Sequence, residues 1–227
     1  MEFSRLEILM NIDNLKNKKV LVIGVGGVGG YAVEALARCG IGNITIVDYD
    51  KVDISNINRQ IIALHSTIGL FKVEVLKKRI LDINPNCLVE TFNCFYDEKT
   101  TDLIFNKDYD YILDCCDSLK SKELLIREAN KRNIKIISSM GAGFKFDPSK
   151  IQIEKLKNTS YDKLARILRY NLKDNKKCLE IPVVYSKEQM EKKGTTIGSN
   201  AFIPSIFGLT MVSYIINDIR KENYEEN

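Results

Sequence analysis

Four closely spaced glycines and a later aspartate have the residue types and spacing of a nucleotide-binding unit. The sequence GVGGVGG places Gly24, Gly26, Gly27 and Gly29 directly after an apolar run, and a second apolar run ends at Asp48. A glycine turn at the start of a helix presents backbone N–H groups to a phosphate, and a carboxylate after the next strand can hold a ribose. An NAD site has the same spacing, so an NAD-dependent oxidoreductase or a nucleotide-sensing module stays open on this pattern alone.

The segment after this unit carries more polar side chains than a hydride-transfer cofactor needs. It reads DYDKVDISNINRQ and contains Asp48, Asp50, Asn56, Asn58 and Arg59. This excess of carboxylates, amides and a guanidinium argues against a simple NAD site.

A lysine and an aspartate further along the chain could handle phosphates and a metal. Lys72 opens a predicted helix, where its ammonium could swing over bound phosphates, although a lone lysine is more often a surface residue. Asp117, in DCCDS, follows a strand and should lie at the carboxyl edge of the sheet, where open α/β sheets bind ligands. Mg²⁺ prefers one or two carboxylates together with phosphate oxygens, so Asp117 is a natural ligand. Asp117 and Ser118 could instead cap the following helix.

Other residue types limit the chemistry. His65 is the only histidine and has no evident nucleophile beside it, which argues against histidine-based nucleophilic catalysis. The six cysteines contain no CxxC pair, so neither a four-cysteine zinc site nor a disulfide framework is expected, and most should be small core residues. Arg5 stands alone before the predicted fold and by itself suggests only a solvated side chain.

The elements that must position these residues alternate between strand and helix over the first two-thirds of the chain. Apolar runs predict strands at 20–23, 44–47, 88–92, 111–113 and 135–138, and helical periodicity predicts helices at 28–39, 71–83, 98–105 and 119–132. The last third should hold strands at 151–155 and 182–185, a basic amphipathic helix at 161–172 and a closing apolar helix at 204–220. The fold class is therefore α/β: a Rossmann-like, mostly parallel sheet with helices on both faces, plus a C-terminal extension of short strands and helices.

Composition and charge bound the functional class. A chain of 227 residues with 44% hydrophobic and 28% charged residues suits one ordinary globular domain. The N-terminus mixes charged with apolar residues, and the longest apolar stretch is interrupted by Pro204 and Gly208, so we expect a cytoplasmic protein without a membrane segment. Residues 145–193 hold 13 Lys and Arg against 7 Asp and Glu, whereas the rest holds 21 against 23. This basic excess is either a solvated helix face or a contact for a polyanion.

The motifs together resemble one superfamily. GVGGVGG, DYDKVDISNINRQ, IGLFK and DCCDS are similar to the ubiquitin-activating-type adenylating fold, which includes the bacterial activators of sulfur-carrier proteins, over nearly the whole chain. The resemblance implies that Gly27 lines the loop around ATP and that Asp48 holds the ribose. It also implies that Asn56, Asn58 and Arg59 engage the phosphates.

The same resemblance implies a metal and a second subunit. Lys72 would lie beside the phosphates and Asp117 would hold Mg²⁺. Arg5 resembles the arginine finger that reaches the ATP site of a neighbouring subunit, which would make a homodimer part of the mechanism. The expected ATP site therefore comprises Gly24, Gly26, Gly27, Gly29, Asp48, Asp50, Asn56, Asn58, Arg59, Lys72, Asp117 and Ser118, with catalytic roles for Arg59, Lys72, Asp117 and Arg5.

Within this superfamily, the chain resembles the tRNA threonylcarbamoyladenosine dehydratases. The similar segments are INPNC, SSMGAGFKFDPSKIQI and the helix DKLARILRYNLK, and the two CxxC pairs typical of sulfur-carrier activators are missing. The family often has a cysteine and a serine together in the strand after this helix, whereas here that strand reads IPVVYS and Cys178 precedes it. An adenylyltransferase that activates a ubiquitin-like sulfur carrier is the alternative.

This resemblance implies an activity and partners. The modified adenosine at position 37 of tRNA would be converted to a cyclic form at the expense of ATP, through adenylation of the threonyl carboxylate and intramolecular attack. The partners would be tRNA, a second copy of the chain and, as a further candidate, a sulfur-transfer protein. We expect one adenylating domain over 1–227, with an N-terminal helix or arm at 1–18, a nucleotide-binding core at 19–144 and a basic substrate-binding extension with the closing helix at 145–227.

Overall fold

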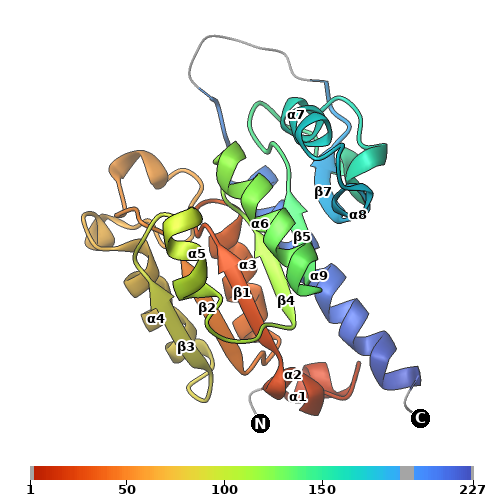
Figure 1. Ribbon diagram of the computed structural model, residues 1–227. Coiled ribbons are helices and arrows are strands. Elements are labelled where there is room, and N and C mark those ends of the chain that lie inside the picture. The colour runs from red at the N-terminus through yellow and green to blue at the C-terminus, as the bar shows by residue number, and fades with distance from the viewer. Residues whose placement is uncertain (1–2, 190–196, 226–227) are drawn as a thin grey trace.

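A seven-stranded sheet lies at the centre of the part of the chain that the computed structural model describes, residues 3–189 and 197–225 (Figure 1). Its order is β3-β2-β1-β4-β5-β7-β6, and every neighbouring pair is parallel except β6 with β7. The strands are β1 (Lys19–Ile23), β2 (Asn43–Val47), β3 (Leu88–Phe92), β4 (Tyr111–Asp114), β5 (Lys135–Ser139), β6 (Ile151–Lys155) and β7 (Pro182–Ser186). The chain leaves β1 toward β2 and returns to β4 on the other side, so a topological switch point lies between β1 and β4.

Helices cover both faces of this sheet, as predicted. The helices are α1 (Ser4–Glu7), α2 (Asp13–Asn17), α3 (Gly29–Arg38), α4 (Lys72–Ile83), α5 (Glu98–Ile104), α6 (Leu119–Arg132), α7 (Lys163–Asn171), α8 (Lys176–Leu179) and α9 (Phe202–Glu225). Buried side chains of α3, α4 and α9 belong to one hydrophobic cluster, and those of α5, α6, α7 and α8 belong to the other. The short helices α1, α2 and α8 lack enough periodic positions to be recognised from the sequence.

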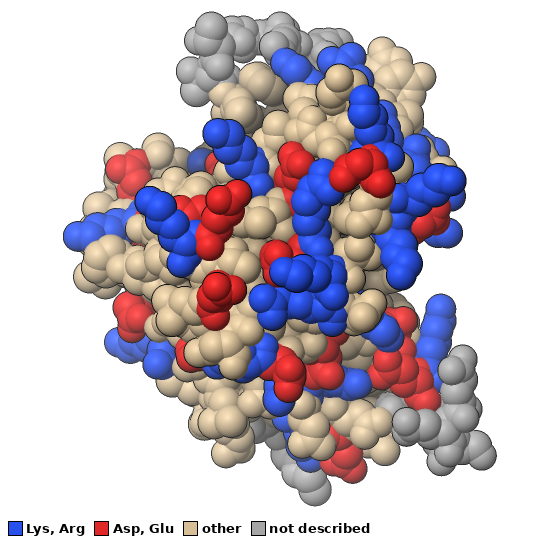
Figure 2. Space-filling view, viewed as in Figure 1, with Lys and Arg blue, Asp and Glu red and all other residues tan. Residues whose placement is uncertain are grey.

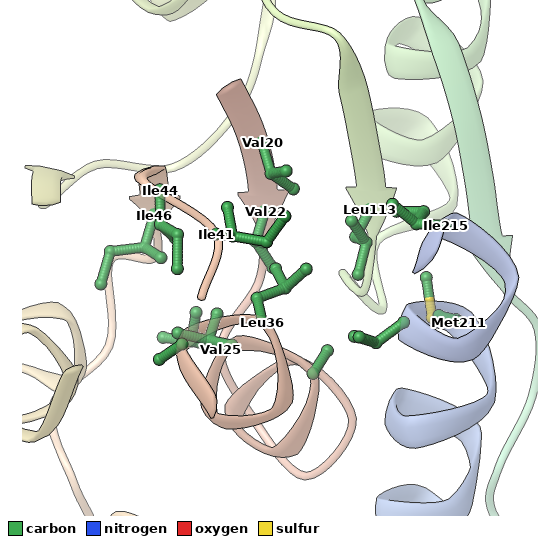
Figure 3. Close-up of a cluster of buried hydrophobic side chains, with 14 of the residues drawn as sticks. Val20, Val22, Val25, Leu36, Ile41, Ile44, Ile46, Leu113, Met211 and Ile215 are labelled. Atoms are coloured by element: carbon green, nitrogen blue, oxygen red, sulfur yellow. The ribbon is translucent and has the colours of Figure 1, made fainter. Parts of the chain in front are cut away.

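The side-chain alternation of the strands divides the core in two. Val20 and Val22 of β1 point into the α3 side, whereas Leu21 and Ile23 point to the α6 side. All four are at least 98% buried, because successive residues of a strand face opposite sides of the sheet and helices cover both. Figure 3 shows the α3-side cluster, where side chains from the strands meet α3 and the Met211 turn of α9.

Helix α9 is longer than predicted. Pro204 lies in its first turn, where a proline lacks no intrahelical hydrogen bond. Gly208 lies where α9 crosses α3, and a Cβ on it would stand 2.3 Å from the carbonyl oxygen of Val28. Both residues therefore lie inside the helix. The charged sequence from Lys221 onward predicts a frayed tail, but Lys221 is helical as well.

The same helix is apolar enough to resemble a membrane span. Its mean hydropathy is 1.4 over Phe202–Glu222. Ile203, Phe207, Met211 and Ile215 are buried against the rest of the fold at spacings of four. A helix buried inside a protein core has this composition too.

The C-terminal extension continues the main sheet rather than forming a separate layer. β7 pairs in parallel with β5, and β6 pairs antiparallel with β7, so the edge of the Rossmann-like core is covered. Helix α7 confirms the amphipathic helix predicted at 161–172, with Ala165 and Leu168 fully buried. Residues 192–200 are rich in small polar side chains, which predicts a mobile segment, and 192–196 lie outside the described residues.

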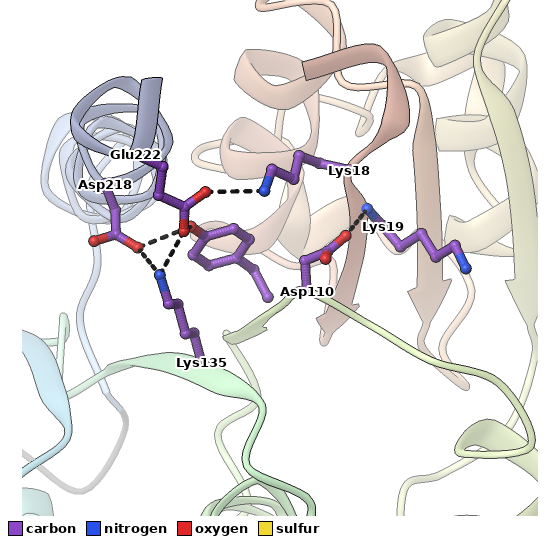
Figure 4. Close-up of polar contacts among 7 residues, drawn as sticks. Lys18, Lys19, Asp110, Lys135, Asp218 and Glu222 are labelled. Carbon is purple, nitrogen blue, oxygen red and sulfur yellow. Dashed lines mark hydrogen bonds and ion pairs between the residues drawn. The ribbon is translucent and has the colours of Figure 1, made fainter. Parts of the chain in front are cut away.

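A charged network attaches α9 to the amino-terminal edge of the sheet. The Lys135 ammonium lies 2.7 Å from carboxylate oxygens of both Asp218 and Glu222, and Glu222 also pairs with Lys18 (Figure 4). The Tyr111 hydroxyl donates to Asp218 at 2.8 Å. These contacts fix the closing helix at the edge that lies opposite the glycine turn.

Candidate active site

A cavity of about 590 Å³ opens at the carboxyl ends of β1, β2 and β4, where the topology switches direction. Its volume is typical of a site for a small ligand. One part, which we call the nucleotide half, is lined by the glycine turn and by residues that follow β2, β3 and β4. The rest, the acceptor half, is lined by Ser139–Gly143, Leu164 of α7, Ile197, Ser199 and Pro204.

The glycine turn joins β1 to α3 and must pass very close to β4. Gly24 has φ of +84°, and a Cβ on it would stand 2.9 Å from backbone atoms of Cys115 and Cys116. Any other residue would therefore push the turn away from the sheet. Gly26 and Gly27 line the cavity, whereas Gly29 packs inside against the Gly24 carbonyl and does not line it.

Asp48 and Asp50 are placed by the end of β2. The Asp48 carboxylate accepts hydrogen bonds from the backbone N–H groups of Val25 and Asp50, both at 2.8 Å, and lines the cavity. Burial raises the pKa of Asp48 although these two donors act to lower it. Asp48 therefore ties the glycine turn to β2 while keeping lone pairs for a ligand hydroxyl.

Lys72 is held beside the nucleotide half by Asp50. Its ammonium lies 2.7 Å from the Asp50 carboxylate, and Lys72 is only 5% exposed. Because both side chains line the cavity, an incoming phosphate would meet a lysine that is already positioned. Asp50 thus supports the lysine in this structure, a role that its position in the sequence did not suggest.

The amide and guanidinium groups of the segment 54–60 hold one another. Asn56 accepts from the backbone N–H of Asp53 at 3.1 Å and is buried, which closes a capping box on the short helix Ile54–Asn56. Arg59 donates to the Ser55 carbonyl at 2.8 Å and to the Asn58 amide oxygen at 2.9 Å. Asn56 and Arg59 line the cavity, while Asn58 lies outside the lining and orients Arg59.

Asp117 and Ser118 have separate functions at the end of β4. Ser118 is the N-cap of α6, since its hydroxyl accepts from the Ser121 N–H at 3.3 Å. Asp117 is exposed, lines the cavity and has no hydrogen-bond or ion-pair partner among the described residues. The carboxylate is therefore available for a ligand.

The donor set fits a metal that arrives with phosphates. Within 3–189 and 197–225, no group of three or more His, Cys, Asp or Glu side chains could hold a metal ion. A single carboxylate facing a cavity suits Mg²⁺, which keeps several waters and takes further oxygens from a substrate phosphate. The protein thus offers Asp117 alone and no closed metal cage.

Tyr49, Phe95 and Gln60 are among the lining residues that the sequence did not identify. Tyr49 and Phe95 pack edge to face with ring centroids 5.2 Å apart, and Phe95 follows β3 just as Tyr49 follows β2. Gln60 also lines the cavity, and its buried Oε1 has no partner among the described atoms. For Tyr49 and Phe95, the position shortly after strands that end at the same edge was the available signal.

The acceptor half is built by contacts between distant segments. The backbone N–H of Gly141 donates at 3.0 Å to Asp162, which also caps α7 through the Ala165 N–H at 2.8 Å. Asn58 donates to the Ser199 carbonyl at 3.0 Å and so connects the two halves.

The cysteines are not poised as nucleophiles. Cys115 and Cys116 line the cavity, but burial raises the pKa of both thiols. Burial likewise raises the pKa of Cys87 to about 11 and, to a lesser extent, that of Cys178. A thiol rather than a thiolate is thus favoured at neutral pH, and the thiolate is the reactive form.

The remaining predicted residue, Arg5, lies far from the cavity of its own chain. It is exposed on α1, and Phe3 at the start of α1 packs against Gly40, which follows the last turn of α3. The cavity lies at the first turn of α3, ten residues away, or about 15 Å along the helix. The structure therefore brings together all predicted ATP-site residues except Gly29 and Asn58 and leaves Arg5 at the opposite edge.

Comparison with known proteins gives consistent matches along the whole chain. The model of the ThiF family matches residues 4–227. The tRNA threonylcarbamoyladenosine dehydratase of Bacillus subtilis is 40% identical, over 97% of this chain and 95% of that protein. The enzyme of the same name from Haemophilus influenzae is 36% identical, over 93% and 89%. The crystal structure of Escherichia coli tRNA N6-threonylcarbamoyladenosine dehydratase in complex with ATP has a TM-score of 0.94 at 33% identity, covering 100% of this chain and 96% of that one.

Proposed function

The chain belongs to the ThiF family, and we infer that it is an ATP-dependent tRNA threonylcarbamoyladenosine dehydratase. The observation that carries this function is a single cavity with two unlike halves. The nucleotide half has the glycine turn, Asp48, Arg59 and Lys72, and the acceptor half is open beside Gly141. One cavity can therefore hold ATP and the carboxylate that ATP activates.

The first chemical step is adenylation. A threonyl carboxylate oxygen attacks the α-phosphorus of ATP, and the bond to pyrophosphate breaks. Negative charge builds up on the phosphate oxygens, and cationic groups that are already in place stabilise it without reorganisation. Arg59, oriented by Asn58, and Lys72, oriented by Asp50, are these groups.

We propose that Asp117 holds Mg²⁺ in this step. Bound Mg²⁺ would supply charge neutralisation at the phosphates, which is its usual contribution to phosphate chemistry. The support is the exposed carboxylate of Asp117, which lines the cavity and has no hydrogen-bond or ion-pair partner among the described residues.

The second step needs no protein nucleophile. The carbamoyl group of the same modified base attacks the activated acyl carbon, loses a proton and expels AMP, which carries away the carboxylate oxygen. Intramolecular attack is strongly accelerated when the two groups are held in contact. The protonated state favoured for Cys115 and Cys116 agrees with a mechanism that does not pass through a thioester.

Turnover with purified protein tests this function. The protein, ATP, Mg²⁺ and tRNA carrying the threonylcarbamoyl group should give AMP, pyrophosphate and the cyclic nucleoside, which mass spectrometry detects. Asp117→Ala should lower the rate by about 10²–10³ at moderate Mg²⁺. Asp102→Ala, an exposed acid on α5, is the matched control. Activation of a sulfur-carrier tail with no product from tRNA would instead establish the alternative adenylyltransferase.

We also propose that the enzyme is a cytoplasmic homodimer with shared sites. Arg5 can approach a bound ATP only if it belongs to another copy. The segment that follows β2 supports an interface, because Ile54, Leu64 and Leu70 are each more than half exposed. Mixing Arg5→Ala with Asp117→Ala should regenerate one intact site per heterodimer. If activity stays absent although the subunits exchange, Arg5 does not act across the interface.

A further inference from the structure

Helix α7 carries one exposed face that its packing does not explain. Lys163, Arg166 and Tyr170 follow one another at spacings of three and four, which places them on the same side of the helix, and Lys173 lies in the turn after its last residue. All four are exposed, whereas Ala165 and Leu168 on the opposite side are fully buried. We call these four residues the α7 stripe.

The cations of the α7 stripe differ from their basic neighbours in having no acidic partner. Among the described residues, Lys163, Arg166 and Lys173 form no ion pair. Lys155 and Lys157, by contrast, both pair with Glu180. Figure 2 shows Lys and Arg side chains gathered on the upper right, over the region where Figure 1 labels α7 and α8.

Arg169 shows that a basic residue of this helix need not face solvent. The three-residue spacing of Lys163, Arg166 and Arg169 predicts that all three lie on one outward face. Its guanidinium instead turns back to the Thr159 hydroxyl and the Leu156 carbonyl, because these acceptors lie beside the helix. Arg169 therefore fixes α7 to the preceding segment and leaves the stripe as the unpaired basic face.

Two exposed tyrosines accompany these cations. The Tyr170 side chain is 69% exposed, and the Lys173 ammonium lies 4.3 Å from its ring centroid. Tyr161 is 61% exposed and has a φ of +56°, a left-handed conformation that is uncommon for a tyrosine. The two hydrogen bonds that Asp162 accepts hold the chain in this conformation.

The stripe begins at the rim of the acceptor half. Leu164, in the first turn of α7, lines the cavity, and Asp162 bonds to Gly141, which also lines it. A substrate whose reacting group enters the acceptor half would therefore extend over Tyr161 and along α7.

We propose that Tyr161 and the α7 stripe bind unpaired nucleotides of the anticodon loop, with bases stacked on Tyr161 and Tyr170 and phosphates on Lys163 and Arg166. This rests on the proposed function, because the modified adenosine lies in that loop. Exposed aromatic rings interleaved with unpaired cations are what single-stranded nucleic acid needs, since every base has a face that can stack. Paired RNA offers only phosphates and a shallow groove, so the tyrosines select the loop.

Binding measurements with two RNA ligands test this proposal. One is the isolated anticodon stem-loop, and the other is a fully paired RNA with the same number of phosphates. Tyr170→Ala should weaken stem-loop binding about tenfold and leave duplex binding unchanged, and Tyr170→Phe should behave like the wild type. Arg166→Glu should weaken both and lower the salt dependence by about one phosphate contact. Lys78→Glu on α4 is the matched charge control.

The outcome separates this proposal from the proposed function. If Tyr170→Ala binds both RNAs as the wild type does, or loses both equally, the stacking role is wrong. Failure of the wild type to form the cyclic nucleoside would refute the dehydratase function, whereas the difference between the two RNAs would still be measurable.

Discussion

Within the nucleotide half, the segment 54–60 is held largely by bonds between near neighbours in the sequence, whereas the acceptor half is held by bonds between distant segments. Asn56 bonds to Asp53, and Arg59 bonds to Ser55. In the acceptor half, Gly141 bonds to Asp162, twenty-one positions away. Asn200 donates to the Lys145 carbonyl, fifty-five positions away, and Phe144 donates to the Gly198 carbonyl.

This difference indicates how one fold can adenylate different substrates. A segment held by local bonds, such as 54–60, keeps its geometry when the rest of the chain changes. A half built from long-range bonds can be rebuilt by altering one distant segment, without disturbing the phosphates. We therefore expect substitutions in the two halves to separate ATP chemistry from tRNA recognition, and four predictions test this separation.

The largest expected effect is on a buried ion pair on which both halves depend. Lys122 and Asp114 are both essentially unexposed, with N and O 3.0 Å apart, and Asp114 also accepts from Ser138 of β5. Burial alone lowers the pKa of Lys122, but the Asp114 carboxylate raises it on balance, so the lysine stays charged. Lys122→Met should leave Asp114 buried without its partner and lower the free energy of unfolding by about 3–5 kcal/mol.

Urea unfolding measures this loss, with Lys120→Met on the exposed side of the same helix as control. If the free energy of unfolding falls by less than about 1 kcal/mol, the usual contribution of a surface ion pair, the buried pair does not support the two halves.

A smaller effect, confined to the nucleotide half, is expected for Lys72→Met. Loss of this ammonium should lower the rate of AMP formation by about 10²–10³, the usual cost of removing one group that stabilises a developing charge. Binding of the anticodon stem-loop should stay unchanged. Asp50→Asn is the matched control, since it breaks the same ion pair but keeps the cation. If the rate of AMP formation falls equally in Lys72→Met and Asp50→Asn, the ion pair matters only for structure.

The opposite result, a loss of tRNA turnover with unchanged ATP binding, is expected for Asp162→Ala in the acceptor half. This change removes the N-cap of α7 and the acceptor for Gly141, at a cost of about 1–2 kcal/mol in stability. Turnover of tRNA should fall about tenfold because the reacting carboxylate is less well positioned. The dissociation constant for ATP, measured by calorimetry, should not change.

Asp162→Asn, which keeps one acceptor, should lie between the wild type and Asp162→Ala in tRNA turnover. Loss of ATP affinity in either variant would contradict the independence of the two halves.

The smallest effect is expected at the amino-terminal edge, which belongs to neither half. Burial acts to raise the pKa of Asp218 and Glu222, but hydrogen bonds from Lys135 lower it on balance. Carboxyl groups with a lowered folded-state pKa stabilise the protein above their unfolded pKa near 4, and this contribution disappears as pH falls through the folded value. Lys135→Met should therefore cost less than about 1 kcal/mol at pH 7, because the groups are partly exposed.

The difference in stability between this variant and the wild type should shrink as pH falls below about 4 and through the lowered folded-state pKa values of the two carboxyl groups. Thermal unfolding at pH 7 and pH 3 measures this difference. If the variant and the wild type differ in unfolding temperature as much at pH 3 as at pH 7, the charge-based account is wrong. Any change in AMP formation would show that this edge is coupled to the cavity.

Much of the fold could be predicted because its signals are local. The helices predicted at 119–132 and 71–83 agree within one residue with α6 and α4, because apolar periodicity runs through both and Asn133, in a left-handed C-cap, ends α6. The glycine turn could be predicted because Gly24 has a positive φ and lies so close to the backbone of Cys115 and Cys116 that only glycine fits.

Local signals failed where a partner came from far away. Pro204 and Gly208 suggested an interruption, but the first fits the start of a helix and the second fits a crossing with α3 that the sequence cannot show. For the same reason, the basic pattern of α7 could not reveal that Arg169 turns back toward Thr159.

The sequence by itself determined which residues can handle a nucleotide, because glycine, Asp48 and Lys72 act through their own geometry and charge next to the strands that carry them. Only the tertiary structure decided which distant residues meet: Asp50 beside Lys72, Asp162 beside Gly141, and Arg5 at the opposite edge. The physical reason is the distance along the chain over which each effect acts. Backbone conformation depends on neighbours within a few residues, whereas side-chain partners depend on how distant segments pack around one core.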